Sequence, residues 1–389
     1  MCGFVGFWNT PEVADYETVI HAMADRIIHR GPDDAHYYVD DDISLGFRRL
    51  SIIDLEGGRQ PILNEDGSKA LLFNGEIYNY QSLREDLLQK GHTFTTKSDS
   101  ETILHGYEEY GKEILQKLRG MFAFVIWDKK EKKLFGARDI FGIKPFYYTV
   151  QQEQFIFASE IKSILEHPAY ERELNREALE QYLSFQFSAL PETFFKGIYK
   201  LPPAHSMVVH PDGHIEMKQY WSPLFDENEV SCSLHEAADR VGEAMRESVH
   251  YHNVADVEVG SFMSSGIDSS YMAALLAQEN PLVQTFTVGF SEYEGERDEI
   301  SWAAELAEKL DVSNTNKYIT QDEYWKALPY VQWHMDEPSG DPSAVALFFV
   351  DQIASKKVKA VLSGEGADEL FGGYKICLLY TSPSPRDPK

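Results

Sequence analysis

The chain has 389 residues, a length that predicts two domains, because single hydrophobic cores rarely grow beyond roughly 250–300 residues. Its 63 acidic and 36 basic side chains give a formal net charge of −27, which argues against non-specific binding of nucleic acid or of an anionic membrane surface. Three widely spaced cysteines without a C-x-x-C pair, and the lack of a long apolar run or a signal peptide, predict a protein of the reducing cytoplasm.

The first 200 residues alternate apolar strands with turns and short helices. Strands are predicted at 43–53, 70–74, 121–127, 133–138 and 154–159, and amphipathic helices at 16–29 and from about 80 to 90. Sheets packed as layers under such helices predict an α+β domain of the αββα type over residues 2–205. Paired prolines and an Asp-Gly turn then mark a last hairpin and a linker, which we place at 206–232.

The pattern changes at Ser233, which with Glu236 predicts a capping box at the start of a helix. Strands are then predicted at 257–263, 284–290, about 316–319 and 358–364, alternating with helices such as 298–310. This alternation predicts an α/β domain with a doubly wound parallel sheet over 233–374, whose ligands lie at the carboxyl ends of the strands. The Ser- and Pro-rich residues 375–389 continue no periodic pattern, and we expect them to be a non-native or disordered tail of an incomplete domain.

Cys2 is the first candidate for chemistry. Removal of Met1 would place a thiol and a free amine on the same residue, and their ordinary pKa values, about 8.5 and 8, are close enough for proton transfer between them. An N-terminal nucleophile of this kind needs no separate histidine. Taken alone, a cysteine at the second position is more often an accident of sequence, so the rest of the chain must decide.

Other residues suit an enzyme that attacks the amide of an amino acid. Asn74 and Gly75 offer a side-chain amide and a backbone N–H to an oxyanion. Arg49 suits an α-carboxylate and Asp99 an α-ammonium. Each has an ordinary alternative, because Asn-Gly pairs are usually hairpin turns and single Arg or Asp residues usually lie in solvent or in surface pairs.

Two further segments suit a nucleotide. SFMSSGIDSS (261–270) runs from a strand through a small-residue loop into a helix, where backbone N–H groups can cradle a pyrophosphate. LSGEGADELFGGY (362–374) places a second glycine-rich loop, with Glu365, Asp368 and Glu369, after another parallel strand. A Ser/Gly turn before a helix is commonly only a cap, but two carboxylate-bearing loops at adjacent strand ends predict a magnesium and ATP site.

Seven ordered blocks make the chain recognisable: MCGFVGFW at the start, HRGPDD (29–34), RLSIID (49–54), NGEIYNY (74–80), SDSE (98–101), GMFAFVIWD (120–128) and RDIFGIKPFYY (138–148). Over Met1 to Tyr374 the chain resembles class II glutamine amidotransferases of the asparagine synthetase B family, whose first domain is an N-terminal nucleophile (Ntn) hydrolase. The resemblance implies that Cys2 is the nucleophile and that Asn74 and Gly75 form the oxyanion hole. It also implies a set of glutamine-binding residues: Arg49, Leu50, Ser51, Ile52, Ile53, Asn74, Gly75, Glu76 and Asp99.

The same resemblance assigns roles elsewhere in the chain. His29 and Arg30 are expected to shape the pocket, and Arg138 and Asp139 to brace a turn. In the second domain Glu365 would assist ammonia attack, while Asp268 and Asp368 would hold Mg²⁺. The residues expected to contact ATP are Met263, Ser264, Gly266, Asp268, Ser269, Ser270, Val288, Ser363 and Gly364. One departure is Ser265, which stands where the family's phosphate loop usually has glycine and tightens that loop.

By this resemblance the chain is expected to split glutamine at Cys2 and to pass the ammonia to a β-aspartyl-AMP, giving asparagine, glutamate, AMP and pyrophosphate. The expected partners are glutamine, aspartate and ATP, with no nucleic acid and no membrane, and homodimers are common in the family. Because family members continue past the SGEG segment, we expect a complete glutaminase domain and a partly folded synthetase domain, so that the chain retains glutaminase activity alone.

Two alternatives stay open. A relative of β-lactam-forming synthetases would use the same domains on another carboxylate, and a non-catalytic relative would act in protein interaction. Enzymes that aminate sugars or phosphoribosyl pyrophosphate are disfavoured, since they lack the pair of loops SSGIDSS and SGEGADE.

Overall fold

The computed structural model describes residues 1–151, 154–224, 231–295 and 298–374, so the expected tail at 375–389 lies outside the described residues. The chain divides into two compact units. The first comprises Met1–Ser231 together with Gln332–Asp341, and the second comprises Cys232–Val331 and Pro342–Lys389. Among the described residues no helix combines the length and the apolar character needed to cross a membrane.

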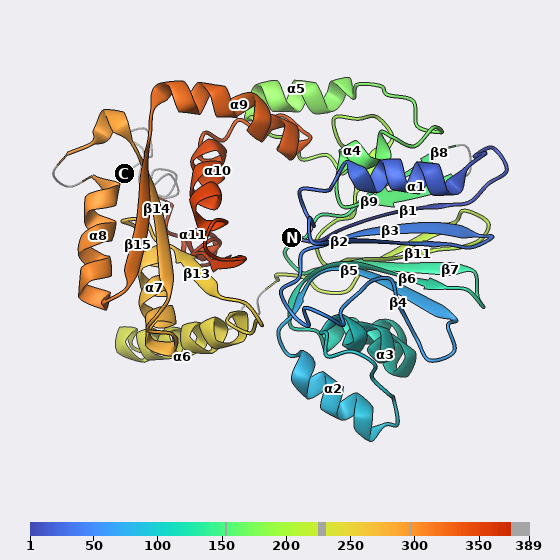
Figure 1. Cartoon of the computed structure of the whole chain (residues 1–389), viewed down its shortest axis with the longest axis horizontal. Helices are drawn as coiled ribbons and strands as arrows, with labels where there is room; N and C mark the ends of the chain where they lie inside the picture. The colour runs from blue at the N-terminus through green and yellow to red at the C-terminus, as the bar shows by residue number, and fades with distance from the viewer. Residues whose placement is uncertain (152–153, 225–230, 296–297, 375–389) are drawn as a thin grey trace, which may run out of the picture. The chain divides into compact units, whose positions relative to one another are not determined.

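Two antiparallel sheets stack face to face in the first unit (Figure 1). One has the order β10-β8-β9-β1-β3-β2 and contains β1 (Gly3–Trp8), β2 (Asp34–Val39), β3 (Ile43–Arg49), β8 (Tyr147–Gln151), β9 (Gln154–Ala158) and β10 (Ile198–Lys200). The other has the order β12-β11-β7-β6-β5-β4 and contains β4 (Ile62–Leu63), β5 (Lys69–Ile77), β6 (Gly120–Asp128), β7 (Lys133–Arg138), β11 (His205–Val209) and β12 (Ile215–Gln219).

Helices cover the outer face of each sheet, which confirms the αββα layering (Figure 1). α1 (Tyr16–Asp25) and α4 (Ile161–Ile164) pack on the sheet of β1, whereas α2 (Tyr80–Gln89), α3 (Ser100–Tyr110) and the 3-10 helix η1 (Gly111–Gln116) pack on the sheet of β5. α5 (Arg176–Phe185) follows α4 along the chain. Layers form because successive strand residues face opposite sides: Phe4 packs between the sheets, while Val5 and Phe7 pack beneath α1.

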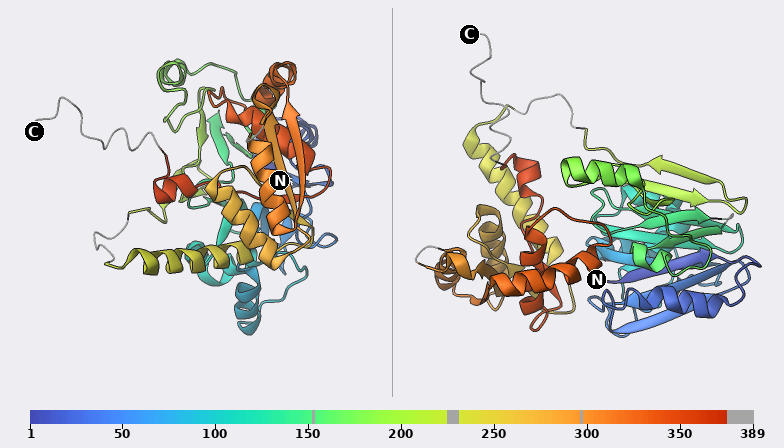
Figure 2. Two further views of the ribbon diagram at one scale, coloured as in Figure 1. Left: turned by 90° about the vertical axis from the view of Figure 1, so that its left-hand side faces the viewer. Right: turned by 90° about the horizontal axis from the view of Figure 1, so that it is seen from above.

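The first unit extends beyond residue 205, where the sequence pattern had placed its end. The hairpin β11–β12, yellow-green in Figure 2, pairs with β7 and continues the second sheet. Met207 and Val209 are fully buried in the core between the sheets, so these residues are part of the domain rather than a linker. The sequence predicted a hairpin in this segment, but its pairing with β7 depends on a partner strand about 70 residues earlier that no local pattern indicates.

The second unit is built on a four-stranded parallel sheet with the order β15-β14-β13-β16, which confirms the doubly wound α/β class. Its elements in chain order are α6 (Leu234–His252), β13 (Val259–Phe262), α7 (Ile267–Glu279), β14 (Gln284–Phe290), η2 (Ser291–Tyr293), α8 (Glu299–Leu310), β15 (Ser313–Ile319), α9 (Gln321–Met335), α10 (Ser343–Ala354), β16 (Ala360–Leu362) and α11 (Ala367–Phe371). The predicted capping box of Ser233 and Glu236 is present at the start of α6.

Helices cover both faces of this sheet, as crossover connections between parallel strands require. α7 and α8 pack together around Met263 and Ala303, and α10 packs on β14 through Phe286 and Val350. Because the chain moves from β13 to β14 on one side and returns to β16 on the other, the strand order reverses between β13 and β16. Such a reversal is where open α/β sheets bind their ligands.

Candidate active site

A pocket in the first unit gathers most of the residues predicted to bind glutamine. Ser51 is the one predicted residue that does not line it, since its N–H donates to Asp33 instead, at 3.0 Å. The lining residues are Met1, Cys2, Arg49, Leu50, Ile52, Ile53, Gly58, Gln60, Phe73, Asn74, Gly75, Glu76, Ser98, Asp99, Ser100 and Lys144.

Cys2 enters this pocket directly before β1. Its Sγ lies 3.4 Å from both the N–H and the carbonyl oxygen of Leu50, and its carbonyl accepts a 2.8 Å hydrogen bond from Arg30 Nε. Arg30 in turn pairs with Glu160 at 2.9 Å, which also pairs with His29. Arg30 therefore holds the nucleophile's backbone, and His29 supports Arg30 through Glu160; neither residue lines the pocket.

Burial changes the acidity of both groups at the chain terminus. It raises the pKa of the Cys2 thiol, and it lowers the pKa of the terminal amino group, here on Met1, to about 5. The amino group is therefore neutral at pH 7 and able to accept a proton. The two shifts oppose a standing thiolate–ammonium pair, so proton transfer should accompany attack on a substrate rather than precede it.

Asn74 and Gly75 lie at the end of β5, beside β6. The Asn74 side chain is 1% exposed, and among the described residues no group accepts a hydrogen bond from its Nδ2. A buried amide without a partner costs free energy unless a ligand satisfies it. A Cβ on Gly75 would stand 2.1 Å from the Met121 carbonyl oxygen, so only glycine allows β5 and β6 to pair here.

Arg49 is placed at the end of β3 by the loop that follows it. Its guanidinium donates to the carbonyl oxygens of Leu55, at 3.1 Å, and Asp54, so its position is set before any substrate arrives. A Cβ on Gly58 would approach Arg49 Nη2 to 2.7 Å, which explains the glycine in this loop. The arrangement presents a buried cation to the pocket.

Two carboxyl groups face the same pocket. Asp99, at the start of α3, is buried and accepts a 2.9 Å hydrogen bond from the Ile77 N–H. Burial raises its pKa to about 6, and burial together with the neighbouring Asp99 raises the pKa of Glu76 to about 7. An ammonium group bound in the pocket would stabilise the charged form of both carboxylates. This agrees with the prediction that Asp99 pairs with the α-ammonium group of a substrate.

Sequence reasoning missed Lys144, Gln60 and Ser98 in this pocket. Lys144 lies in the block 138–148, and the predicted brace is confirmed: Arg138 donates to the carbonyls of Gly142, Lys144 and Leu201, and Asp139 accepts from several N–H groups of the turn. The braced turn points a 5%-exposed lysine at the pocket, and burial lowers its pKa. The available signal was a single lysine in the otherwise uncharged stretch 140–148.

The predicted phosphate loop of the second unit connects β13 to α7. Ser264 and Ser269 share a 2.7 Å hydrogen bond, and Gly266 N–H donates to Ser264 Oγ at 3.1 Å. Ser270 Oγ donates to the Ser264 carbonyl at 3.4 Å. The Ser265 side chain is exposed, so the departure from glycine places no side chain inside the loop.

The loop after β16 lies against the phosphate loop. A Cβ on Gly364 would stand 3.0 Å from Asp268 and from the Ser269 N–H, so the two loops touch at the point where the strand order reverses. Asp268 and Asp368 are partly exposed, and among the described residues neither side chain is held in an ion pair. Their oxygens are the hard ligands that Mg²⁺ takes, so the donor set fits that ion.

Four other predicted residues lie at or near these loops. Ser363 is partly buried, and Glu365 is exposed. The Met263 side chain is 1% exposed in the core of α7 and α8, and its N–H donates to the Phe286 carbonyl at 2.9 Å. The Val288 side chain packs toward α10. The side chains of Met263 and Val288 thus pack in the core of the sheet, and contact of these two residues with ATP stays a prediction.

Each of the two units matches a known protein family. Residues 1–221 match the glutamine amidotransferase domain family, and residues 240–388 match the asparagine synthase family. The putative asparagine synthetase [glutamine-hydrolyzing] 2 of Methanocaldococcus jannaschii is 32% identical over 403 residues, which cover 96% of this chain and 76% of the relative. The chain belongs to the family of glutamine-hydrolysing asparagine synthetases.

Other members of this family are more similar in sequence. Asparagine synthetase [glutamine-hydrolyzing] 1 of Bacillus subtilis is 46% identical over 379 residues, and a putative asparagine synthetase of Mycobacterium bovis is 40% identical over 397 residues. These alignments cover 97% of this chain but only 59% and 61% of the two relatives. The chain thus spans about three-fifths of their length.

Proposed function

We propose that the chain hydrolyses glutamine at Cys2 and that its second unit carries ATP-binding loops of an asparagine-forming synthetase. The observation that carries the first part is the buried, unpartnered amide of Asn74 in the pocket of Cys2. Such an amide is satisfied when a carbonyl oxygen of the substrate becomes an oxyanion, which is the charge that an amide hydrolase must stabilise.

In this mechanism glutamine binds with its α-carboxylate on Arg49 and its α-ammonium between Glu76 and Asp99. The amino group takes the Cys2 proton as Sγ attacks the side-chain amide carbon, and Asn74 Nδ2 and the Gly75 N–H hold the oxyanion. The amine then gives that proton to the leaving nitrogen, so ammonia departs and a thioester remains. Water, deprotonated by the same amine, releases glutamate.

Removal of Met1 is part of this proposal. The Met1 side chain lines the pocket, so its excision both exposes the α-amine of Cys2 and frees space for substrate. The α-amine that excision exposes belongs to Cys2 itself, so the base and the nucleophile would stand on one residue.

The second unit is proposed to bind ATP at the loops that meet at Gly364 and to activate the β-carboxylate of aspartate as an adenylate, which the ammonia then converts to asparagine. Backbone N–H groups of residues 264–270 and the N-terminus of α7 would hold the phosphates. Asp268 and Asp368 would hold Mg²⁺, which supplies charge neutralisation to the pyrophosphate leaving group. The match of residues 240–388 to the asparagine synthase family supports this assignment.

The test is glutamate release by the purified chain after its N-terminus has been checked by mass spectrometry. Cys2→Ala should abolish the activity, and Asn74→Ala should lower kcat by about 10²–10³. The matched control is Cys232→Ala, which removes an exposed thiol and should leave the rate unchanged. A Cys2→Ala chain that still hydrolyses glutamine would refute the mechanism.

A further inference from the structure

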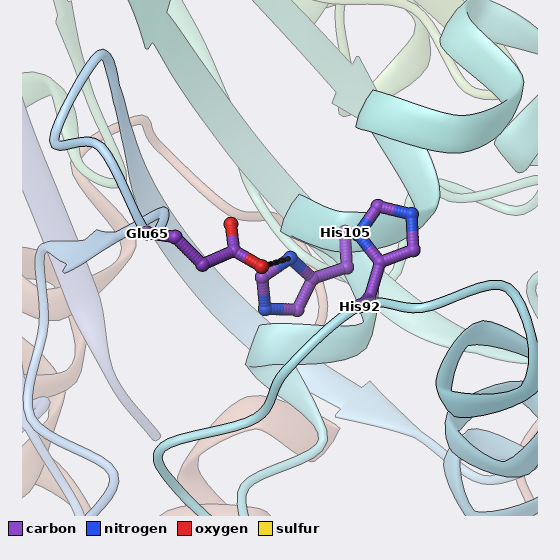
Figure 3. A group of neighbouring side chains, drawn as sticks. All are labelled: Glu65, His92 and His105. Atoms are coloured by element: carbon purple, nitrogen blue, oxygen red, sulfur yellow. Dashed lines mark ion pairs between the residues drawn. The ribbon is translucent and has the colours of Figure 1, made fainter.

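A second cluster of chemically capable side chains lies in the first unit, outside the glutamine pocket. Glu65 follows β4, His92 follows α2 and His105 stands in the middle of α3, and their side chains converge (Figure 3). One ligand atom from each of the three lies within 4.8 Å of the others. None of the three lines the pocket of Cys2.

We propose that His92, His105, Glu65 and the neighbouring Glu108 form a binding site for Zn²⁺. Two imidazoles with carboxylates are a donor set typical of zinc, whereas Mg²⁺ and Ca²⁺ take oxygen ligands alone. The site is independent of the proposed glutaminase chemistry, because it contains no residue of that mechanism.

The distances suit a tetrahedral ion. Zinc bonds of about 2.0–2.2 Å at tetrahedral angles place two ligand atoms about 3.4 Å apart. His105 Nδ1 lies 3.0 Å from Glu108 Oε2 and 3.8 Å from Glu65 Oε1, values on either side of that spacing. One nitrogen of His92 lies within 4.8 Å of the ligand atoms of His105 and Glu65, and His92 Nε2 also pairs with Glu109 at 3.5 Å.

Outer partners orient these ligands, as they do in zinc sites generally. His105 Nε2 lies 3.5 Å from Glu101 Oε1, and both side chains are 1% exposed. Glu101 accepts hydrogen bonds from Thr95 and Thr96, which fix its position beside the ring, although among the described residues no group makes a hydrogen bond with His105 Nε2. His105 Nδ1 faces Glu108 at 3.0 Å and Glu65 at 3.8 Å, and a bound ion would take the place of the proton that Nδ1 shares with these carboxylates.

The carboxylate ligands are held as well. Asn64 Nδ2 donates to Glu108 Oε1 at 2.7 Å, leaving Oε2 for the ion, and Thr93 Oγ1 donates to Glu65 Oε1 at 3.3 Å. The four ligands come from three segments, namely the β4–β5 turn, the loop after α2 and α3 itself. Zinc would therefore fasten the outer helical layer to the edge of the sheet.

The experiment uses the full chain without a histidine tag and with Cys2, Cys232 and Cys377 replaced by alanine, so that no thiol binds the ion. After removal of metal with a chelator, calorimetric titration with Zn²⁺ should show one site per chain. Binding should raise the melting temperature, since a ligand at 100 times its Kd stabilises by about 2.7 kcal/mol. Co²⁺ should give the visible absorption of a tetrahedral site.

His92→Asn and Glu65→Gln are the test variants, because neither side chain is fully buried and their replacement should leave the fold intact. Each should weaken zinc binding at least about tenfold. The matched control is His210→Asn, which removes a histidine paired with Glu216 on the β11–β12 hairpin and should bind as the parent does. No binding by the cysteine-free chain, or binding unchanged in both test variants, would overturn the proposal.

Discussion

Glu76 and Asp99 lead to a prediction about pH at the scale of single residues. Their pKa values of about 7 and 6 mean that both are carboxylates above pH 7 and both are neutral well below pH 6. Since the neutral forms offer no charge to the α-ammonium of glutamine, kcat/KM should fall as the pH is lowered through this interval, mainly through a rise in KM. Steady-state kinetics of glutamate release between pH 5 and pH 8, roughly spanning both pKa values, measures it.

The control for this prediction is glutaramate, which is glutamine without its α-amino group. Its kcat/KM should lack the fall between pH 7 and pH 6, because no ammonium then depends on the two carboxylates. If kcat/KM fell equally at low pH for both substrates, the titrating groups would be the nucleophile and its base instead of Glu76 and Asp99.

What the sequence revealed at this scale depended on local motifs. Cys2, Asn74, Gly75 and Asp99 stand in short blocks whose chemistry is readable, and the structure places them around one pocket. Lys144 and Gln60 were not predicted, because the folded backbone rather than a readable motif directs them to the pocket; the turn braced by Arg138 places Lys144. Gln60 reaches the site by hydrogen bonding both the N–H and the carbonyl of Phe73 on β5.

At the scale of elements, the contact of two loops in the second unit yields a test of the ATP proposal. Asp268→Asn should weaken binding of a non-hydrolysable ATP analogue with Mg²⁺ at least about tenfold, because a carboxylate ligand is lost. Gly364→Ala should also weaken it, because its Cβ would lie 3.0 Å from Asp268 and push the loops apart. Calorimetric titration measures both.

Ser265→Ala is the matched control for these loop variants, since the Ser265 side chain is exposed. All three variants should retain glutaminase activity, because the glutamine pocket lies in the other unit. A parent chain without nucleotide affinity, or equal affinity in all variants, would remove the ATP site from the proposed function.

Helices and strands whose apolar residues recur with a single regular spacing were predictable from the sequence. The strand expected at 284–290 coincides with β14, and the helix expected from Tyr16 has Ile20, Met23 and Ile27 fully buried, although α1 ends earlier, at Asp25. By contrast, β2 (DAHYYV) has half-buried residues throughout and so no alternation to detect. α3 was missed because its first seven residues, Ser100 to Gly106, are all buried although four of them are polar, so no apolar period marks the buried face.

At the scale of the whole molecule, the first unit is not continuous in sequence. Gln332–Asp341 belong to it, although they stand between segments of the second unit. Asp336 accepts a 2.7 Å hydrogen bond from the Ile161 N–H and pairs with Lys162 Nζ at 2.9 Å, and Glu337 pairs with Lys200 at 2.6 Å. No local pattern predicts that residues 332–341 belong to the first unit, because contacts between residues 175 positions apart leave no signal in a single sequence.

Because the segment Gln332–Asp341 belongs to the first unit, a chain of buried charges connects Asp336 to the nucleophile. Asp336 pairs with Lys162, Lys162 with Glu160, and Glu160 with Arg30, which holds the Cys2 carbonyl. Removing one member of a buried ionic network leaves its partners uncompensated. A residue from the second half of the chain should therefore affect both the stability of the first unit and the rate of glutamine hydrolysis.

The corresponding prediction is that Asp336→Ala destabilises the first unit by about 2–4 kcal/mol and lowers kcat for glutamate release. Asp336→Asn should lose less stability, because its side-chain oxygen still accepts from the Ile161 N–H. Asp322→Ala on α9 is the control, since its pair with Lys326 is exposed and such pairs contribute at most about 0.5 kcal/mol. Scanning calorimetry and kinetics measure the two effects, and an Asp336→Ala chain with the melting temperature and kcat of the control would disprove the connection.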